Sequence, residues 1–135
     1  MLELIHAKHS VHRIGLHIVW CTKYRHHVLK AGIDIVVKQT IGEACSAYGW
    51  KCHALEVMSD HVHLFVQIKH TDSAADVAKT LKSLTALAVF HRFPKLKGSK
   101  FWGSGLWSDG TYYGSVGSVS QDTVRRYIDE QKAKT

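Results

Sequence analysis

The stretch "HALEVMSDHVHLFVQI", residues 53–68, contains two apolar runs separated by a Ser-Asp dipeptide. In the second run, apolar residues recur at every second position, at Val62, Leu64 and Val66, which is the period of a half-buried β-strand. Because only two residues separate the runs, we expect an antiparallel hairpin whose second strand spans 61–68. The three valine and leucine side chains should face the core.

The other face of this predicted strand begins with His61 and His63. Side chains two residues apart share a face, and a tight turn places Glu56 opposite His63. Two neutral imidazoles in this arrangement can bind one divalent cation. The chain has 11 histidines in 135 residues, so about one H-x-H pair is expected by chance. The pair alone therefore does not separate a metal site from two surface histidines.

The remaining elements follow from hydrophobic period and capping signals. We expect strands near 15–22, 50–58 and 61–68 and a fourth strand after "FWGSGLW". We expect helices near 31–48 and 73–91 and a third helix from Ser120 or Gln121 onward. Residues 91–100 should form a basic loop. Ser73 is the expected N-cap of the second helix. The order β-α-β-β-α-β-α predicts an α+β fold, a ferredoxin-like or RRM-like sheet with helices on one face and an appended C-terminal helix.

Length and composition indicate one domain, residues 1–135, with an N-terminal extension at 1–13 and a C-terminal helix at 120–133. With 18 Lys and Arg against 11 Asp and Glu, the formal net charge is +7, which favours a nucleic-acid partner over a membrane surface. No apolar run approaches the roughly 20 residues of a membrane span, and the N-terminus has no signal-peptide pattern. We therefore expect a cytoplasmic protein.

Basic and aromatic residues interleave along the chain, a combination typical of single-stranded nucleic-acid binding. The basic candidates are Lys23, Arg25, Arg92, Lys95, Lys97, Lys100, Arg125 and Arg126, and the aromatic candidates are Trp20, Tyr24, Phe101, Trp102, Trp107 and Tyr112. For each residue taken singly, a solvated charge or a core aromatic is an equally good interpretation. Glu56 and Asp60 are candidates to orient the imidazoles of the histidine pair, and Asp60 alternatively serves only the turn.

The last predicted helix carries Tyr127 and Gln131, four residues apart and so on one helix face. A phenol one turn from an amide oxygen lets a docked helix deliver a nucleophile and a hard oxygen ligand to one site. A core aromatic and a solvated glutamine are the alternative interpretation.

Several separated blocks, "CTKYRHHVL", "HALEVMSDHVHLFVQI", "RFPKLK…FWGSGLWS" and "SVGSVSQDTVRRYIDEQ", together resemble a known family. They are similar to the TnpA-type transposases of small insertion sequences, the single-tyrosine HUH transposases of the insertion-sequence-200/605 type. The resemblance runs roughly from His17 to Gln131. It departs from the family pattern at Ser59, where members usually carry proline, and at 109–112, where Pro-Ser-Tyr-Phe is common.

The resemblance implies roles for individual residues. His61 and His63 match the motif that holds the divalent metal, Mg²⁺ or Mn²⁺, Gln131 matches the third protein ligand, and Tyr127 matches the nucleophile. It also implies a homodimer that cuts single-stranded DNA at hairpin-marked element ends and rejoins it through a 5′-phosphotyrosine.

Other functions remain open from the residues themselves. A related HUH nickase would use the same tyrosine. A non-catalytic RRM-like module for single-stranded nucleic acid would explain the charge, the aromatics and the fold, but not the convergence of Tyr127 with the histidines. A small zinc hydrolase would need a third ligand other than Gln131.

Overall fold

The computed structural model describes residues 2–6, 11–99, 105–115 and 121–134. Its elements are β1 (Ile5–His6), β2 (Val11–His12), β3 (Ile14–Cys21), the 3₁₀ turn η1 (Lys23–Arg25), α1 (Ile33–Tyr48), β4 (Lys51–Val57), β5 (His61–Ile68), α2 (Ala74–Arg92), α3 (Pro94–Ser99), β6 (Tyr112–Ser115) and α4 (Gln121–Lys134). The expected α+β order is confirmed, and each predicted strand and long helix is found within a few residues of its expected place.

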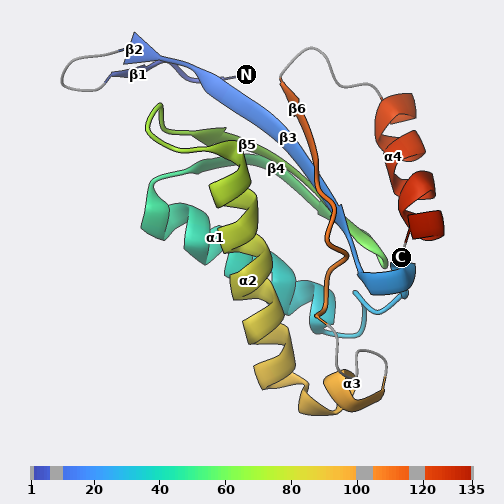
Figure 1. Ribbon diagram of the computed structural model, residues 1–135. Helices are drawn as coiled ribbons and strands as arrows, with labels where there is room; N and C mark the ends of the chain where they lie inside the picture. The colour runs from blue at the N-terminus through green and yellow to red at the C-terminus, as the bar shows by residue number, and fades with distance from the viewer. Residues whose placement is uncertain (1, 7–10, 100–104, 116–120, 135) are drawn as a thin grey trace.

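The main sheet has the antiparallel order β4-β5-β3-β6, so the two strands that flank the first crossover helix are not neighbours. This is the ferredoxin-like, RRM-like arrangement that the element order predicts. Helices α1 and α2 cover one face of the sheet, while α4 lies on the opposite side, beside β3 and β6 (Figure 1). The tyrosine helix and the core-forming helices are therefore on opposite faces.

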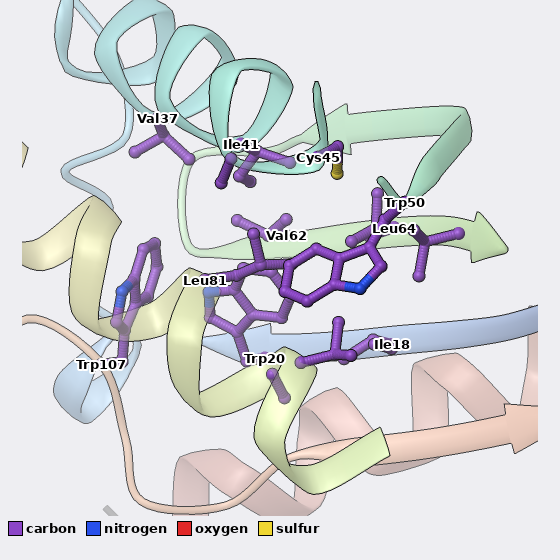
Figure 2. Packing of buried hydrophobic residues seen from close by; sticks show 14 of the residues in the cluster. Ile18, Trp20, Val37, Ile41, Cys45, Trp50, Val62, Leu64, Leu81 and Trp107 are labelled. Carbon is purple, nitrogen blue, oxygen red and sulfur yellow. The ribbon is translucent and has the colours of Figure 1, made fainter. Parts of the chain in front are cut away.

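The core lies between the sheet and the helices α1 and α2 (Figure 2). Val62 and Leu64 of β5 have no exposed surface, and Val37 and Ile41 of α1 meet them from the helix side. The alternating apolar positions of the hairpin thus face inward as expected, since burying such side chains stabilises the fold by roughly 1.5–3 kcal/mol each. The same alternation turns His61 and His63 to the other face.

Local signals explain two of the element boundaries. Ser73 caps α2, because its Oγ accepts a hydrogen bond from the Asp76 amide at 3.0 Å. The basic segment 91–100, expected as a loop, is mostly helical: α2 continues to Arg92 and α3 spans Pro94–Ser99. Pro94 suits the first turn of a helix, since its missing N–H would have no partner there anyway.

No helix in the described ranges is both long enough and apolar enough to cross a bilayer.

Candidate active site

The histidine pair lies on the sheet face that α1 and α2 leave open. His61 and His63 are partly buried, while Val62 between them is fully buried on the other face. The hairpin register places Glu56 directly opposite His63, as the two-residue turn predicts. The strand therefore presents two imidazoles side by side, with a carboxylate opposite one of them.

Asp60 orients His61. The His61 Nδ1–H donates to Asp60 Oδ1 at 2.8 Å, which leaves the lone pair of the neutral ring on Nε2. Asp60 is buried, and burial alone would raise the pKa of its carboxyl; hydrogen bonds from His61 and Arg25, and their charges, outweigh this and lower the pKa. The carboxylate is therefore ionised and holds one tautomer of His61.

Arg25 joins this turn to the C-terminal helix. Its Nε and Nη2 contact Asp60 Oδ2 at 2.9 and 2.8 Å, and its Nη1 lies 3.5 Å from Asp129 Oδ1 on α4. The Arg25 side chain is only 19% exposed, whereas Asp129 is 63% exposed, so the contact with Asp60 is the stronger of the two. Arg25 is also a predicted DNA-binding residue, and its guanidinium is engaged with two carboxylates.

His17 is a neighbour that the sequence did not single out. Its Nδ1 lies 3.0 Å from His63 Nε2, and its ring stacks on Phe65 with centroids 4.8 Å apart. Burial lowers the pKa of His17 and, together with the charge of His17, that of His63. Both imidazoles therefore favour the neutral form, the form that binds cations. The alternation of residues 15–22 places His17 on this face, so the signal was present in the sequence.

Helix α4 packs on this same face. Ile128 is buried against Val19 and Cys21 of β3, and Tyr127 packs at the edge of that cluster. Val19 and Cys21 are the direct cross-strand partners of His63 and His61. The register therefore brings the tyrosine helix over the strand beside the histidine pair (Figure 1).

Tyr127 and Gln131 lie together beneath the loop that precedes β6. A Cβ atom built on Gly110 would lie 3.2 Å from the Tyr127 hydroxyl and 3.0 Å from Gln131 Oε1. The hydroxyl is buried and has no hydrogen-bond partner among the described residues, and burial raises the pKa of Tyr127. The four-residue spacing thus places both polar groups at one spot, as expected from one helix face.

The donor groups available to a cation are few. Within the described ranges, no group of three or more His, Cys, Asp or Glu side chains is arranged to hold a metal ion. His61 and His63 carry ring nitrogens on this face, and Gln131 carries an amide oxygen on the helix packed over it. A set of imidazole and amide oxygen ligands suits a divalent cation that keeps some open positions.

The basic and aromatic candidates separate into different environments. Arg92, Lys95, Lys97, Arg125 and Arg126 are exposed, Lys23 is partly buried, and Lys100, Phe101 and Trp102 lie outside the described residues. Tyr24 is 55% exposed. For Trp20 and Trp107 the alternative of a core aromatic holds: both are buried and pack edge to face in the core, with centroids 5.9 Å apart (Figure 2).

Comparison with known proteins gives consistent matches. The family model described as "Transposase IS200 like" matches residues 10–131. The ISDra2 transposase TnpA of Deinococcus radiodurans is 31% identical over 133 residues, covering 98% of this chain and 94% of the relative. The transposase for insertion sequence element IS200 of Salmonella typhimurium is 25% identical over 119 residues, covering 86% of this chain and 78% of that protein.

Solved structures agree in fold. A crystal structure of a transposase from Deinococcus radiodurans, 31% identical, superposes with a TM-score of 0.86 and covers 94% of this chain and 97% of that one. A REP-associated tyrosine transposase bound to a REP hairpin gives a TM-score of 0.56 at 12% identity, covering 93% and 68% of the two chains, which is a likeness of fold alone. With the family model matching residues 10–131 and a relative 31% identical across nearly its full length, the chain belongs to the IS200-like transposase family.

Proposed function

We propose that this transposase is a metal-dependent enzyme that cleaves and rejoins single-stranded DNA at hairpin-marked ends through a 5′-phosphotyrosine on Tyr127. The observation that supports this most is the docking of α4: it brings a phenol and an amide oxygen to the sheet face that carries His61 and His63. A module that only bound nucleic acid would not need this convergence.

In this proposal His61, His63 and Gln131 hold Mg²⁺ or Mn²⁺, with Asp60 and Glu56 as supporting carboxylates. Asp60 fixes the proton of His61 on Nδ1 and leaves the Nε2 lone pair for a cation, while burial favours neutral His63, whose Nε2 would exchange its contact with His17 for the metal. When bound, the cation polarises the scissile phosphate and offsets the charge that develops on its oxygens.

The proposed chemistry begins at the Tyr127 oxygen, which attacks phosphorus in line while the bond to the 3′-oxygen breaks. The phenol loses its proton and the departing 3′-oxygen gains one, so the products are a 5′-phosphotyrosine and a 3′-hydroxyl. Because burial raises the pKa of Tyr127, the phenol is neutral before the reaction and must lose its proton during attack. Rejoining is the reverse attack by a 3′-hydroxyl, and it conserves the phosphodiester bond energy.

The proposed DNA contacts are the basic residues already predicted. Of these, Arg92, Lys95, Lys97, Arg125 and Arg126 are exposed, and Lys23 belongs with Tyr24 to η1, which α4 contacts. Hairpin ends are proposed because the family resemblance implies them and because a protein of the same fold is described as bound to a REP hairpin. We further propose that the chain acts as a homodimer in the cytoplasm.

A covalent-adduct assay tests the proposal. The purified chain is incubated with hairpin-ended single-stranded DNA, labelled on each side of the cleavage site in turn, with Mn²⁺ or with a chelator. We expect a denaturation-resistant adduct carrying only the DNA on the 3′ side of the break, and only with metal. DNA that is bound but never becomes covalently attached would contradict the enzyme and favour a binding module.

Asp60→Asn should weaken metal binding by about 10- to 100-fold, because an amide no longer fixes the His61 tautomer through a charged acceptor. The measurement is a Mn²⁺ titration followed by electron paramagnetic resonance, on protein whose thermal unfolding shows it to be folded. Glu130→Gln is the matched control, since Glu130 is an exposed carboxylate of α4. Equal Mn²⁺ affinity in Asp60→Asn and the unaltered chain would contradict the role of Asp60.

A further inference from the structure

The segment 105–111 lies between the end of the sheet and α2 and is held by several backbone contacts. The Lys23 amide donates to the Leu106 carbonyl and the Ser108 amide donates to the Cys21 carbonyl, each at 2.9 Å. The Trp107 indole N–H donates to the Lys82 carbonyl at 3.1 Å and to Thr85 Oγ1 at 3.0 Å. These contacts fix the start of the segment to β3 and α2.

Lys82 of α2 fixes the end of the same segment. Its ammonium donates to the carbonyls of Ser108 at 2.9 Å and Gly110 at 3.2 Å, and to Thr111 Oγ1 at 3.2 Å, with the Asp109 carbonyl at 3.5 Å. Burial lowers the pKa of Lys82, and Asp109 partly opposes this. Lys82 is half-buried, and its ammonium, held by several oxygens of one loop, ties that loop to α2.

Gly110, near the end of this segment, lies against Tyr127 and Gln131 of α4. A Cβ atom there would lie 3.0 Å from Gln131 Oε1, 3.2 Å from the Tyr127 hydroxyl and 3.4 Å from Gln131 Cδ. Real Cβ atoms seldom come this close to other atoms, and the backbone of Gly110 is not in the left-handed region. A side chain at this position would therefore displace the two polar groups without straining the loop itself.

We infer that Lys82 is a positioning residue: by holding the carbonyls of residues 108–110, it seats Gly110 against the Tyr127 hydroxyl and the Gln131 amide. The rigid helix α2, on the far face of the sheet, thereby sets where the phenol and the amide lie, although Lys82 touches neither group. The inference rests on the proposed function for its effect on DNA cleavage, but its geometric part can be measured without any DNA.

Three variants of the full chain test it. Lys82→Met keeps an unbranched side chain one atom shorter and removes its donors, and Gly110→Ala adds the crowding Cβ. Lys79→Met is the control, because Lys79 is an exposed lysine one turn earlier on α2. The first readout is the ¹³Cζ resonance of Tyr127 in tyrosine-labelled protein, assigned by its loss in Tyr127→Phe. The second is the single-turnover rate of adduct formation at saturating hairpin DNA, with the affinity for that DNA measured separately.

We expect Lys82→Met and Gly110→Ala each to shift the Tyr127 resonance in the absence of DNA, and Lys79→Met to leave it unchanged. The cleavage rate should fall on the order of 10- to 100-fold in both variants, as misplacement of a reacting group does, with hairpin affinity within about twofold. Should Lys82→Met fail to fold, Gly110→Ala decides alone.

The inference is overturned if the Tyr127 resonance is unchanged in Gly110→Ala or in a folded Lys82→Met. It is also overturned if Lys82→Met loses as much hairpin affinity as it loses cleavage rate. If the unaltered chain forms no adduct, the proposed function fails, and the resonance shifts still determine whether Lys82 positions Tyr127.

Discussion

Tyr127→Phe should abolish covalent adduct formation and strand cleavage while leaving hairpin DNA binding within about twofold. The substitution removes one buried oxygen from a partly buried ring and keeps the shape that packs beside Val19 and Cys21, so α4 should stay docked. Removing a nucleophile typically costs on the order of 10³-fold or more in rate. The rate is measured on labelled single-stranded DNA in Mn²⁺ under single-turnover conditions.

Tyr48→Phe is the matched control for this variant. Tyr48 ends α1, is 46% exposed and stacks on Trp50 away from the histidine face, so its loss should not alter the rate. An adduct that persisted in Tyr127→Phe would contradict the assignment. The first candidates would then be Tyr112, whose ring centroid is 5.6 Å from that of Tyr127, and its neighbour Tyr113.

His63→Ala should reduce cleavage by about 100-fold or more and abolish measurable Mn²⁺ binding at the site, with a much smaller effect on hairpin DNA affinity. His63 lies at the centre of the open face, opposite Glu56 and 3.0 Å from His17 Nδ1, so its loss removes a ligand and unpairs His17. A bound cation lowers the barrier by several kcal/mol, which sets the scale of the loss. Mn²⁺ titration and single-turnover cleavage measure the two effects separately.

His91→Ala is the control, because His91 is an exposed histidine near the end of α2. If His63→Ala lost DNA binding and cleavage in equal measure, the histidine would serve DNA binding and the non-catalytic module would be the better account. If it lost neither, the metal site would have to lie elsewhere on the chain.

Much of this fold could be predicted because its signals are local. The alternation of Val62, Leu64 and Val66 fixes which face of β5 is buried, and therefore where His61 and His63 point. The four-residue interval between Tyr127 and Gln131 likewise places both on one side of α4. Period-2 and period-3.6 patterns carry this information without any knowledge of distant contacts.

The parts that could not be predicted depend on contacts between distant segments. Trp20 and Trp107 are 87 positions apart, and only their packing with α2 makes them core residues instead of stacking platforms for bases. Lys82 is indistinguishable in sequence from a solvated helix lysine until the carbonyls of residues 108–110 and the Thr111 hydroxyl are placed around it. The contact between Arg25 and Asp60 could not be predicted for the same reason, since the two residues are 35 positions apart.

The N-terminal segment sets a boundary on the open face of the sheet. Gln67, two residues beyond Phe65 on the face that carries the histidines, is fully buried; its amide nitrogen donates to the Glu3 carbonyl, and its Oε1 accepts from the Glu3 amide at 3.0 Å. The interval from His61 to Gln67 is about 20 Å at the usual rise of a strand. In the proposed complex, a polynucleotide that ran along β5 from the histidines would meet the main chain of Glu3 just past Phe65 and would have to leave the sheet there.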